Sequence, residues 1–444
     1  MRARLSFVIA SAALLLCTYA AYSQDAVSES VTVIRCGRLL DVRSGELRAN
    51  QLILITGNRI DAVGPEAAMT VPAGARTLDL SRLTCLPGLM DAHTHLVDGP
   101  PGNDTFNWAR PLMRSGAQMA FDAAVNARAT LEAGFTSVRD LGTYRAFVDV
   151  ALREAIDRDR IPGPRMLPAG AYVTITGGAG ALTGFAPDVA LPLELRFGVA
   201  DGPDKVRERT REIIRGGAGV IKVLSTGAIL TLGSRPGAPE FTVEELRAAV
   251  DEANKAGLKA AAHAHSSAGA QNAIHAGVAS IEHGTLLDDE TLRLMKERGV
   301  FLMMDAFASW EFWPGGTPEG KPQGYPQEFI DKEKVSYANQ VNVLRRAMEL
   351  GVRIAFGTDA GVIPHGMNAR LFQVYVKNGM KPLDAIRTAT LNNAELFGWA
   401  DRVGAIEPGK LADIIAVREN PLEDITTLER VAFVMKNGKV FRTP

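Results

Sequence analysis

The stretch Pro87-Gly-Leu-Met-Asp-Ala-His-Thr-His95 follows the apolar run Arg82-Leu-Thr-Cys-Leu86, and together they predict a buried strand that runs into its loop. Side chains alternate between the two faces of a strand, so His93 and His95 are expected on the same face. Two imidazoles at this spacing can hold one metal ion. The alternative is a pair of hydrogen-bonded histidines at a strand end, because the motif is short. Further strands that end in metal-ligating side chains would favour the metal.

The composition is that of an ordinary globular protein. The chain has 444 residues, 46% of them hydrophobic and 22% charged, which is enough for one large α/β domain with an appendage. The formal net charge of −1 argues against a dedicated role in binding nucleic acid or a membrane surface.

The first residues predict a signal peptide. Arg2 and Arg4 precede an apolar run from Leu5 to about Ala21, and the small residues Ala21 and Ser23 occupy positions −3 and −1 of a cleavage after Ser23. The run is short for a membrane anchor and is followed by polar residues. A lipoprotein cysteine is disfavoured because a bulky leucine precedes Cys17. Residues 1–23 are therefore expected to be removed from an exported protein, periplasmic or secreted, that keeps no membrane segment.

Two cysteines, Cys36 and Cys85, remain after this cleavage. They are too few for a disulfide scaffold. An oxidising compartment permits one bridge between them, but two buried thiols are an equally good interpretation.

Both ends of the chain have a β-strand pattern. Short β-branched runs punctuated by glycine occur near the N-terminus, and Asn437-Gly438 predicts a hairpin turn near the C-terminus. We expect residues 24–86 and 401–444 to form one small discontinuous β-sandwich. The expected strands are Val31–Arg35, Leu52–Thr56, Arg59–Val63, Asp413–Val417 and Val431–Met435.

The centre, residues 87–400, alternates strands and amphipathic helices. About eight strands fit a closed (β/α)8 TIM-like barrel, which makes the fold class α/β. The alternative, an open doubly wound sheet, lacks its Gly-x-Gly-x-x-Gly turn after the first strand. The expected strands are Leu83–His93, Thr136–Arg139, Arg165–Pro168, Val220–Leu224, Lys259–His263, Ser280–His283, Val300–Met304 and Arg353–Gly357; the clearest helices are Val243–Ala256, Glu290–Arg298 and Lys332–Leu350.

Candidate metal ligands occur at or near the carboxyl ends of these strands, where chemistry collects in such a barrel. Lys222 is set among apolar residues, where an amine must deprotonate or find a partner. His263 and His283 end two consecutive strands, and Asp359 follows the last one. Each has a structural alternative, such as a core histidine or a helix-capping aspartate. Together with His93 and His95 they predict a metal centre.

This set of residues resembles the amidohydrolase superfamily, in its binuclear branch with a carboxylated lysine. The resemblance covers about 31–442 and includes Gly357-Thr-Asp359 and the tail Gly404-Ala-Ile-Glu-Pro-Gly-Lys-Leu-Ala-Asp413. It implies two divalent cations, with zinc expected and manganese or cobalt as substitutes. It assigns His93, His95 and Asp359 to one ion and His263 and His283 to the other, with N6-carboxylated Lys222 between them. Asp359 is then the catalytic acid and base.

The motifs look most like the imidodipeptidase, Xaa-Arg carboxypeptidase and ochratoxinase cluster of that superfamily. The implied substrate is a small peptide-like amide, a dipeptide, an N-acyl amino acid or ochratoxin A, and the implied assembly is a homo-oligomer, dimer or octamer. Many relatives have histidine where this chain has Ala179. A cyclic-amide hydrolase and a non-catalytic metal-binding protein are the alternative functions. The expected substrate contacts are His265, His365, Tyr144 and Arg235, with a mouth loop at 311–327 beside the aromatic residues Phe307, Trp310, Phe312 and Trp313.

Overall fold

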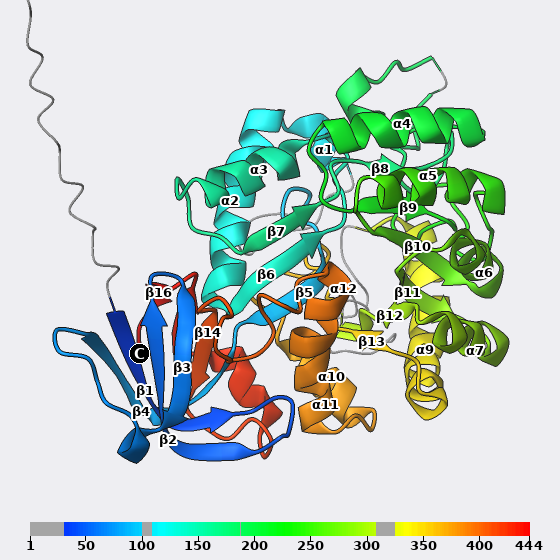
Figure 1. Cartoon of the computed structure of the whole chain (residues 1–444). Helices are drawn as coiled ribbons and strands as arrows, with labels where there is room; N and C mark the ends of the chain where they lie inside the picture. The colour runs from blue at the N-terminus through cyan, green and yellow to red at the C-terminus, as the bar shows by residue number, and fades with distance from the viewer. Residues whose placement is uncertain (1–30, 100–108, 187, 308–324) are drawn as a thin grey trace, which may run out of the picture.

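The computed structural model describes residues 31–99, 109–186, 188–307 and 325–444 (Figure 1). The predicted signal peptide and most of the predicted mouth loop, with Trp310, Phe312 and Trp313, lie outside these ranges. Within them, no helix combines the length and the apolar character that a bilayer crossing would need.

Strands from both ends of the chain join in one seven-stranded sheet, in the order β16-β15-β14-β4-β1-β2-β3, at the lower left of Figure 1. The Asn-Gly turn between its last two strands is confirmed, and Asn437 and Gly438 have φ of 51° and 73°. The strands are β1 (Val31–Leu40), β2 (Leu47–Thr56), β3 (Arg59–Pro65), β4 (Arg76–Pro87), β14 (Ile414–Val417), β15 (Phe433–Lys436) and β16 (Lys439–Arg442).

Hydrogen bonds link all seven strands of this terminal unit into one sheet, and the predicted β-sandwich stays a prediction. One apolar core is nevertheless shared by its two ends: Ile53 and Ile60 of β2 and β3 belong to the same buried cluster as Phe433 and Met435 of β15. A disulfide between Cys36 and Cys85 joins β1 to β4 inside this core, and it decides between the two interpretations of the cysteines.

The centre of the chain forms two parallel sheets, β5-β6-β7 and β13-β12-β11-β10-β9-β8, so the fold is mixed α/β. The expected strand Leu83–His93 is divided at Gly88, with β4 in the terminal sheet and β5 in a parallel one. The strands are β5 (Leu89–Thr94), β6 (Phe135–Asp140), β7 (Arg165–Pro168), β8 (Tyr172–Val173), β9 (Ile221–Leu224), β10 (Ala260–Ser266), β11 (Ser280–Leu286), β12 (Phe301–Met303) and β13 (Ile354–Ala355).

Backbone hydrogen bonds connect the two parallel sheets at two places. Gly219 N, just before β9, donates to Pro168 O of β7 at 2.7 Å. On the other side, Ala92 N of β5 donates to Phe356 O after β13 at 2.8 Å, and His95 N donates to Ala360 O at 2.6 Å. The carboxyl end of β5 therefore lies beside the segment that follows β13.

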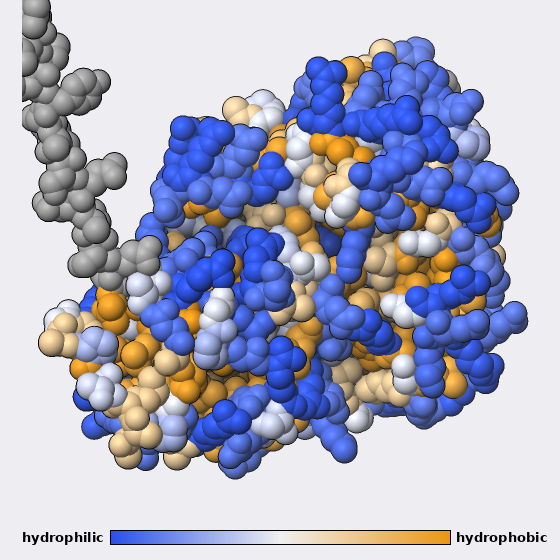
Figure 2. Space-filling model, viewed as in Figure 1, coloured by the Kyte–Doolittle hydropathy of each residue, from blue (hydrophilic) through white to orange (hydrophobic). Residues whose placement is uncertain are grey.

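Helices flank the parallel sheets (Figure 1), and hydrophilic side chains cover much of their outer surface in the view of Figure 2. Three predicted helices are confirmed to within a few residues: α5, α7 and α9. The helices are α1 (Arg110–Met113), α2 (Gly116–Glu132), α3 (Val148–Asp157), α4 (Pro203–Arg215), α5 (Val243–Lys255), α6 (Ser267–Ala276), α7 (Asp289–Arg298), α9 (Gln327–Leu350), α10 (Arg370–Lys377), α11 (Pro382–Arg387) and α12 (Asn393–Phe397).

Candidate active site

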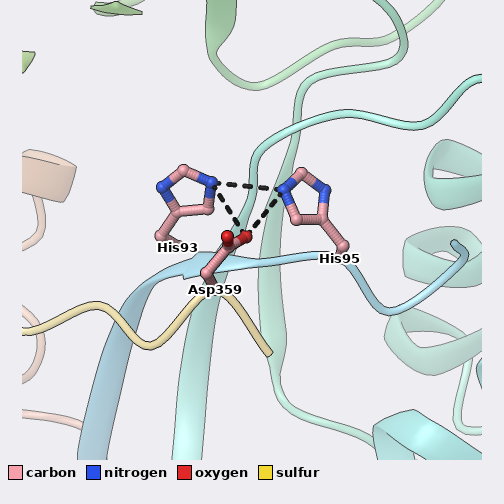
Figure 3. A group of neighbouring side chains, drawn as sticks. All are labelled: His93, His95 and Asp359. Carbon is pink, nitrogen blue, oxygen red and sulfur yellow. Dashed lines mark hydrogen bonds and ion pairs between the residues drawn. The ribbon is translucent and has the colours of Figure 1, made fainter. Parts of the chain in front are cut away.

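Two histidines and one carboxylate converge at the carboxyl end of β5 (Figure 3). His93 Nε2 lies 3.2 Å from His95 Nε2, and Asp359 Oδ1 lies 3.5 Å and 3.2 Å from these two nitrogens. Asp359 reaches the pair because Asp359 N donates to His93 O, which holds the loop after β13 against β5. His93 and His95 therefore lie on the same face, as the sequence predicted.

The hydrogen bonds of both rings leave the facing nitrogens as acceptors. His93 Nδ1 donates to Glu282 Oε2 at 3.0 Å, and His95 Nδ1 donates to Gly142 O at 2.9 Å. An acceptor-only partner fixes the proton on Nδ1 and leaves a lone pair on Nε2. In the neutral rings, two nitrogen lone pairs and a carboxylate oxygen point toward one another, which is an arrangement that a cation stabilises. Without a metal ion a proton on His95 Nε2, directed at Asp359 Oδ1 at 3.2 Å, supplies that positive charge, and a bound metal ion would take its place.

A second pair of histidines follows the same rule. His263 Nε2 donates to Gly227 O at 3.2 Å, and His283 Nδ1 donates to Asp305 Oδ2 at 3.0 Å. The ring centroids of these two histidines are 4.5 Å apart, and that of His283 is 5.0 Å from His93. His283, Asp305 and Asp359 also each offer a ligand atom within 4.8 Å of the others.

The backbone at His283 and Asp359 is left-handed, with φ of 69° and 57°. His263 and His283 lie on consecutive strands as predicted, but they are offset by one residue: His263 pairs with Glu282, and His283 pairs with Ala264. Neighbouring strand residues normally face opposite sides. The left-handed turn lets Glu282 and His283 both face the site, at the backbone cost that is common at functional positions.

Lys222 on β9 lines the same cavity and is 2% exposed. Burial lowers the pKa of its amine to about 8, although the charges of Glu282 and Asp359 oppose the shift. Its side chain makes no hydrogen bond or ion pair with any residue that the structure describes. A buried amine whose pKa lies near neutral pH, and which has no such partner, is reactive.

Burial and charge set the protonation of the cluster. Burial lowers the pKa of His93, His263 and His265 well below the usual value. Burial also acts to lower the pKa of His95, but the hydrogen bond and charge of Asp359 raise it to about 9. Asp359 in turn has a pKa of about 2, because the hydrogen bond and charge of His95 outweigh its burial.

A cavity of about 170 Å³ opens over these groups, and His265 and Tyr144 line it as predicted. Ala179 lies on the cavity wall as well, and its N–H donates to the carboxylate of Glu240. His265 Nδ1 lies 2.9 Å from Thr285 Oγ1, a partner that can donate or accept, so its tautomer is not fixed in this way.

The other two predicted substrate contacts lie elsewhere. Arg235 is exposed on the loop after β9 and is outside the cavity wall. His365 is buried, with Nδ1 3.4 Å from Thr130 Oγ1 of α2, and it is also outside the wall. Both residues were predicted as substrate contacts because they follow a strand, but position in the sequence does not show the direction in which a loop turns.

Sequence reasoning missed three charged residues that support the site. Glu282 Oε1 accepts from Arg139 at 2.6 Å while its other oxygen holds His93, and Arg139 Nε donates to Ala92 O of β5. Asp305 holds His283. Asp305 follows the strand predicted at Val300–Met304, so a search of every strand end would have found it.

Comparison with known proteins identifies the family. Residues 84–441 match the model described as the amidohydrolase family. This chain belongs to the amidohydrolase family. It is accordingly a hydrolase that acts on amide or peptide bonds, and the family generally binds divalent metals.

Individual relatives agree. Ochratoxinase of Aspergillus niger is 34% identical over 434 residues, which is 93% of this chain and 87% of the relative. A crystal structure of a Xaa-Pro dipeptidase with bound methionine in the active site has a TM-score of 0.86 at 35% identity, covering 93% of this chain and 100% of that one. The crystal structure of A. niger ochratoxinase has a TM-score of 0.82 at 30% identity, covering 94% and 96%.

Proposed function

We propose that this amidohydrolase uses a binuclear metal centre to hydrolyse the amide between an acyl group and a terminal amino acid. One observation carries the proposal: four histidines of the site each have one ring nitrogen engaged by an oxygen acceptor, which leaves the other ring nitrogen of each to bind a cation. Histidines ordered in this way by carbonyls and carboxylates are typical of metal sites.

The donor set fits two divalent ions, for which zinc suits the nitrogen and oxygen ligands. His93, His95 and Asp359 would hold one ion, and His263 and His283 the other. Lys222 would bridge them as a carbamate, formed when its neutral amine adds to carbon dioxide and loses a proton. The depressed pKa of this amine supports the neutral form.

The chemistry divides between the ions and the chain. When bound, such an ion pair polarises a carbonyl and lowers the pKa of water. Asp359 accepts the proton of the attacking water and returns it to the leaving amine nitrogen. His265 and Tyr144, both on the cavity wall, contact the substrate.

The relatives support the substrate class. A dipeptidase and an ochratoxinase both match over more than nine tenths of this chain. We therefore propose dipeptides, N-acyl amino acids and ochratoxin A as the compounds to test.

We also propose that β5, β6, β7 and β9 to β13 are the eight strands of one closed (β/α)8 barrel over residues 87–400, with the two-residue β8 as a short addition beside β9. The hydrogen bonds from Gly219 to Pro168 and from Ala92 to Phe356 support closure, because they join β7 to the start of β9 and β5 to the segment after β13. Residues 24–86 and 401–444 then form the second unit.

Export and self-assembly complete the proposal. The disulfide supports an oxidising compartment, periplasmic or extracellular, that the protein reaches through the signal peptide at 1–23. Exposed apolar side chains on α1 and α2 support a homo-oligomer: Met113, Phe121 and Val125 are 68%, 76% and 54% exposed.

The test is an assay of purified protein against dipeptides, N-acyl amino acids and ochratoxin A, with cyclic ureides in parallel. We expect the protein to release a free amino acid. This activity should be lost when a chelator removes the metal and should return when Zn²⁺ is added. Metal-loaded protein that opens only cyclic ureides, or that cleaves none of these compounds, would contradict the proposal.

A further inference from the structure

Asp305 is a buried carboxylate that is only half used. It follows β12, lines the cavity and is 8% exposed. Its Oδ2 accepts from His283 Nδ1, whereas its buried Oδ1 has no hydrogen-bond partner among the residues that the structure describes. The preceding backbone is held in place, because Tyr375 Oη donates to Met304 O at 2.9 Å.

Glu282 shows what a satisfied carboxylate in this site looks like. One of its oxygens accepts from Arg139 and from Ser280 Oγ, and the other accepts from His93. Leaving a buried oxygen unpaired costs about 1–3 kcal/mol, and more when the group is charged. Asp305 has the same histidine-orienting role as Glu282 but lacks the cationic partner.

The chain supplies no such partner to Asp305 at the cavity wall. Among the described residues that line the cavity, Lys222 is the sole lysine or arginine, and the proposed carboxylation would remove its positive charge. Asp305 also lies close to a second carboxylate, since both it and Asp359 offer oxygens to the same group within 4.8 Å. Two buried like charges at this separation favour a cationic hydrogen-bond donor between or beside them.

We propose that Asp305 Oδ1 binds the α-ammonium group of the substrate's amino-terminal residue. This inference rests on the proposed amidase function and narrows it to dipeptides with a free amino group. In a dipeptide the α-nitrogen is one carbon from the scissile carbonyl. Asp359, proposed to transfer protons during attack on that carbonyl, is the neighbour of Asp305. An ammonium has three donors, so it can bind Asp305 at the short distance typical of charge-assisted hydrogen bonds.

A matched pair of substrates isolates this contact: alanyl-phenylalanine and propionyl-phenylalanine, which differ only in the α-amino group. We expect the wild type to prefer the alanyl compound by at least about tenfold in kcat/KM. Asp305→Asn keeps an oxygen for His283 and removes the charge, so it should lose at least about tenfold on the alanyl compound and less than about threefold on the propionyl compound. Ser336→Ala, at the same cavity wall, is the control and should keep the preference.

Two results would overturn the proposal. An equal loss on both substrates would mean that Asp305 acts only through His283, and loss of one metal ion in Asp305→Asn by elemental analysis would make Asp305 a ligand.

A binding measurement separates this proposal from the proposed function, because it needs no turnover. Calorimetry of the metal-loaded protein would compare L-methionine with 4-(methylthio)butanoate, its analogue without the amino group. We expect L-methionine to bind at least about tenfold more tightly to the wild type, and Asp305→Asn to bind both alike. Equal affinities in the wild type would reject the ammonium site, whereas failure to cleave the phenylalanine compounds and every other amide of the proposed panel would reject the amidase function alone.

Discussion

Four histidines of the site owe their orientation to neighbours of two kinds. Backbone carbonyls fix His95 and His263, and carboxylates fix His93 and His283. The sequence could predict the histidines because strand ends can be found from apolar runs. It could not predict the carbonyl partners, since any residue type can supply a carbonyl. Nor could it predict that Arg235 lies outside the cavity, because the direction of its loop has no local sequence signal.

Among single residues, Asp359→Asn should lower kcat by at least about a thousandfold, because the amide cannot accept the proton of the attacking water. The amide oxygen can still contact a cation, so much of the metal should stay bound. Steady-state kinetics and elemental analysis measure the two effects. Turnover close to wild type in the metal-loaded variant would remove Asp359 from the proton-transfer role.

Glu282→Gln should weaken metal binding by about 10–100-fold, because the amide has one oxygen for donors on two sides, Arg139 and His93, and an NH2 group facing His93 cannot fix its tautomer. It should also lower the free energy of unfolding by about 3 kcal/mol, since Arg139 keeps a buried charge without its partner. Metal titration and urea unfolding are the measurements. Glu66→Gln removes an exposed ion pair with Arg35 and is the control; comparable losses in both variants would argue against a special role for Glu282.

Among the elements, the break between β4 and β5 decides how the terminal sheet meets the parallel strands. The sequence predicted one strand across it because the apolar run is continuous. Gly88 makes the break possible: a Cβ there would lie 2.2 Å from Thr136 Oγ1 of β6. That close approach depends on a distant strand and has no local sequence signal.

Gly88→Ala should therefore destabilise the protein by about 1–3 kcal/mol, as overpacking does in a close-packed core. Thermal unfolding would measure it, and adding Thr136→Ala should recover part of the loss. Gly237→Ala, where a Cβ would meet no atom within 4 Å, is the control. Equal melting temperatures of the Gly88 and Gly237 variants would show that β6 can shift to make room for the added methyl group, which would contradict the prediction.

Helices α4 and α5 are joined by Glu252, whose carboxylate accepts from Arg207, Arg211 and Lys255. Hydrogen bonds from Arg211 and Lys255 lower the pKa of Glu252 from 4.5 to about 2. Between these two values the unfolded chain binds more protons than the folded one, so this stabilisation is complete above about pH 5 and is lost as the pH falls toward 2.

Glu252→Gln should cost about 1 kcal/mol at pH 7, and the difference from the wild type should narrow between pH 5 and pH 3. Urea unfolding at several pH values measures it. Glu208→Gln, at an exposed pair with Lys205 on α4, serves for comparison. A difference that stays constant with pH would assign the effect to packing rather than charge.

For the whole molecule, the two ends of the chain complete one sheet, and the Cys36–Cys85 bridge lies in its core. Alternating apolar patterns were enough to predict that both ends are β-rich. They were not enough to decide between a bridge and two thiols, because pairing depends on how β1 meets β4: the register shifts between Cys36 and Arg38, and the Cα atoms of Cys36 and Cys85 lie 6.0 Å apart.

Replacing both cysteines with serine should lower the free energy of unfolding by about 2–4 kcal/mol, because the bridge closes a loop of 49 residues in the unfolded chain. Protein recovered from an oxidising compartment should have neither Cys36 nor Cys85 available to a thiol reagent after denaturation. Two reactive thiols at these positions, or an unchanged melting temperature in the double variant, would contradict the bridge.

The central claim is that residues from β5, β9, β10, β11 and the loop after β13 hold two divalent ions. A crystal structure with anomalous scattering at the zinc edge, on protein purified without chelators, tests it most directly. We predict two peaks per chain, one bound by His93, His95 and Asp359 and one by His263 and His283, with density for a carboxylated Lys222 between them. Absence of both peaks, or peaks away from these histidines, would contradict it.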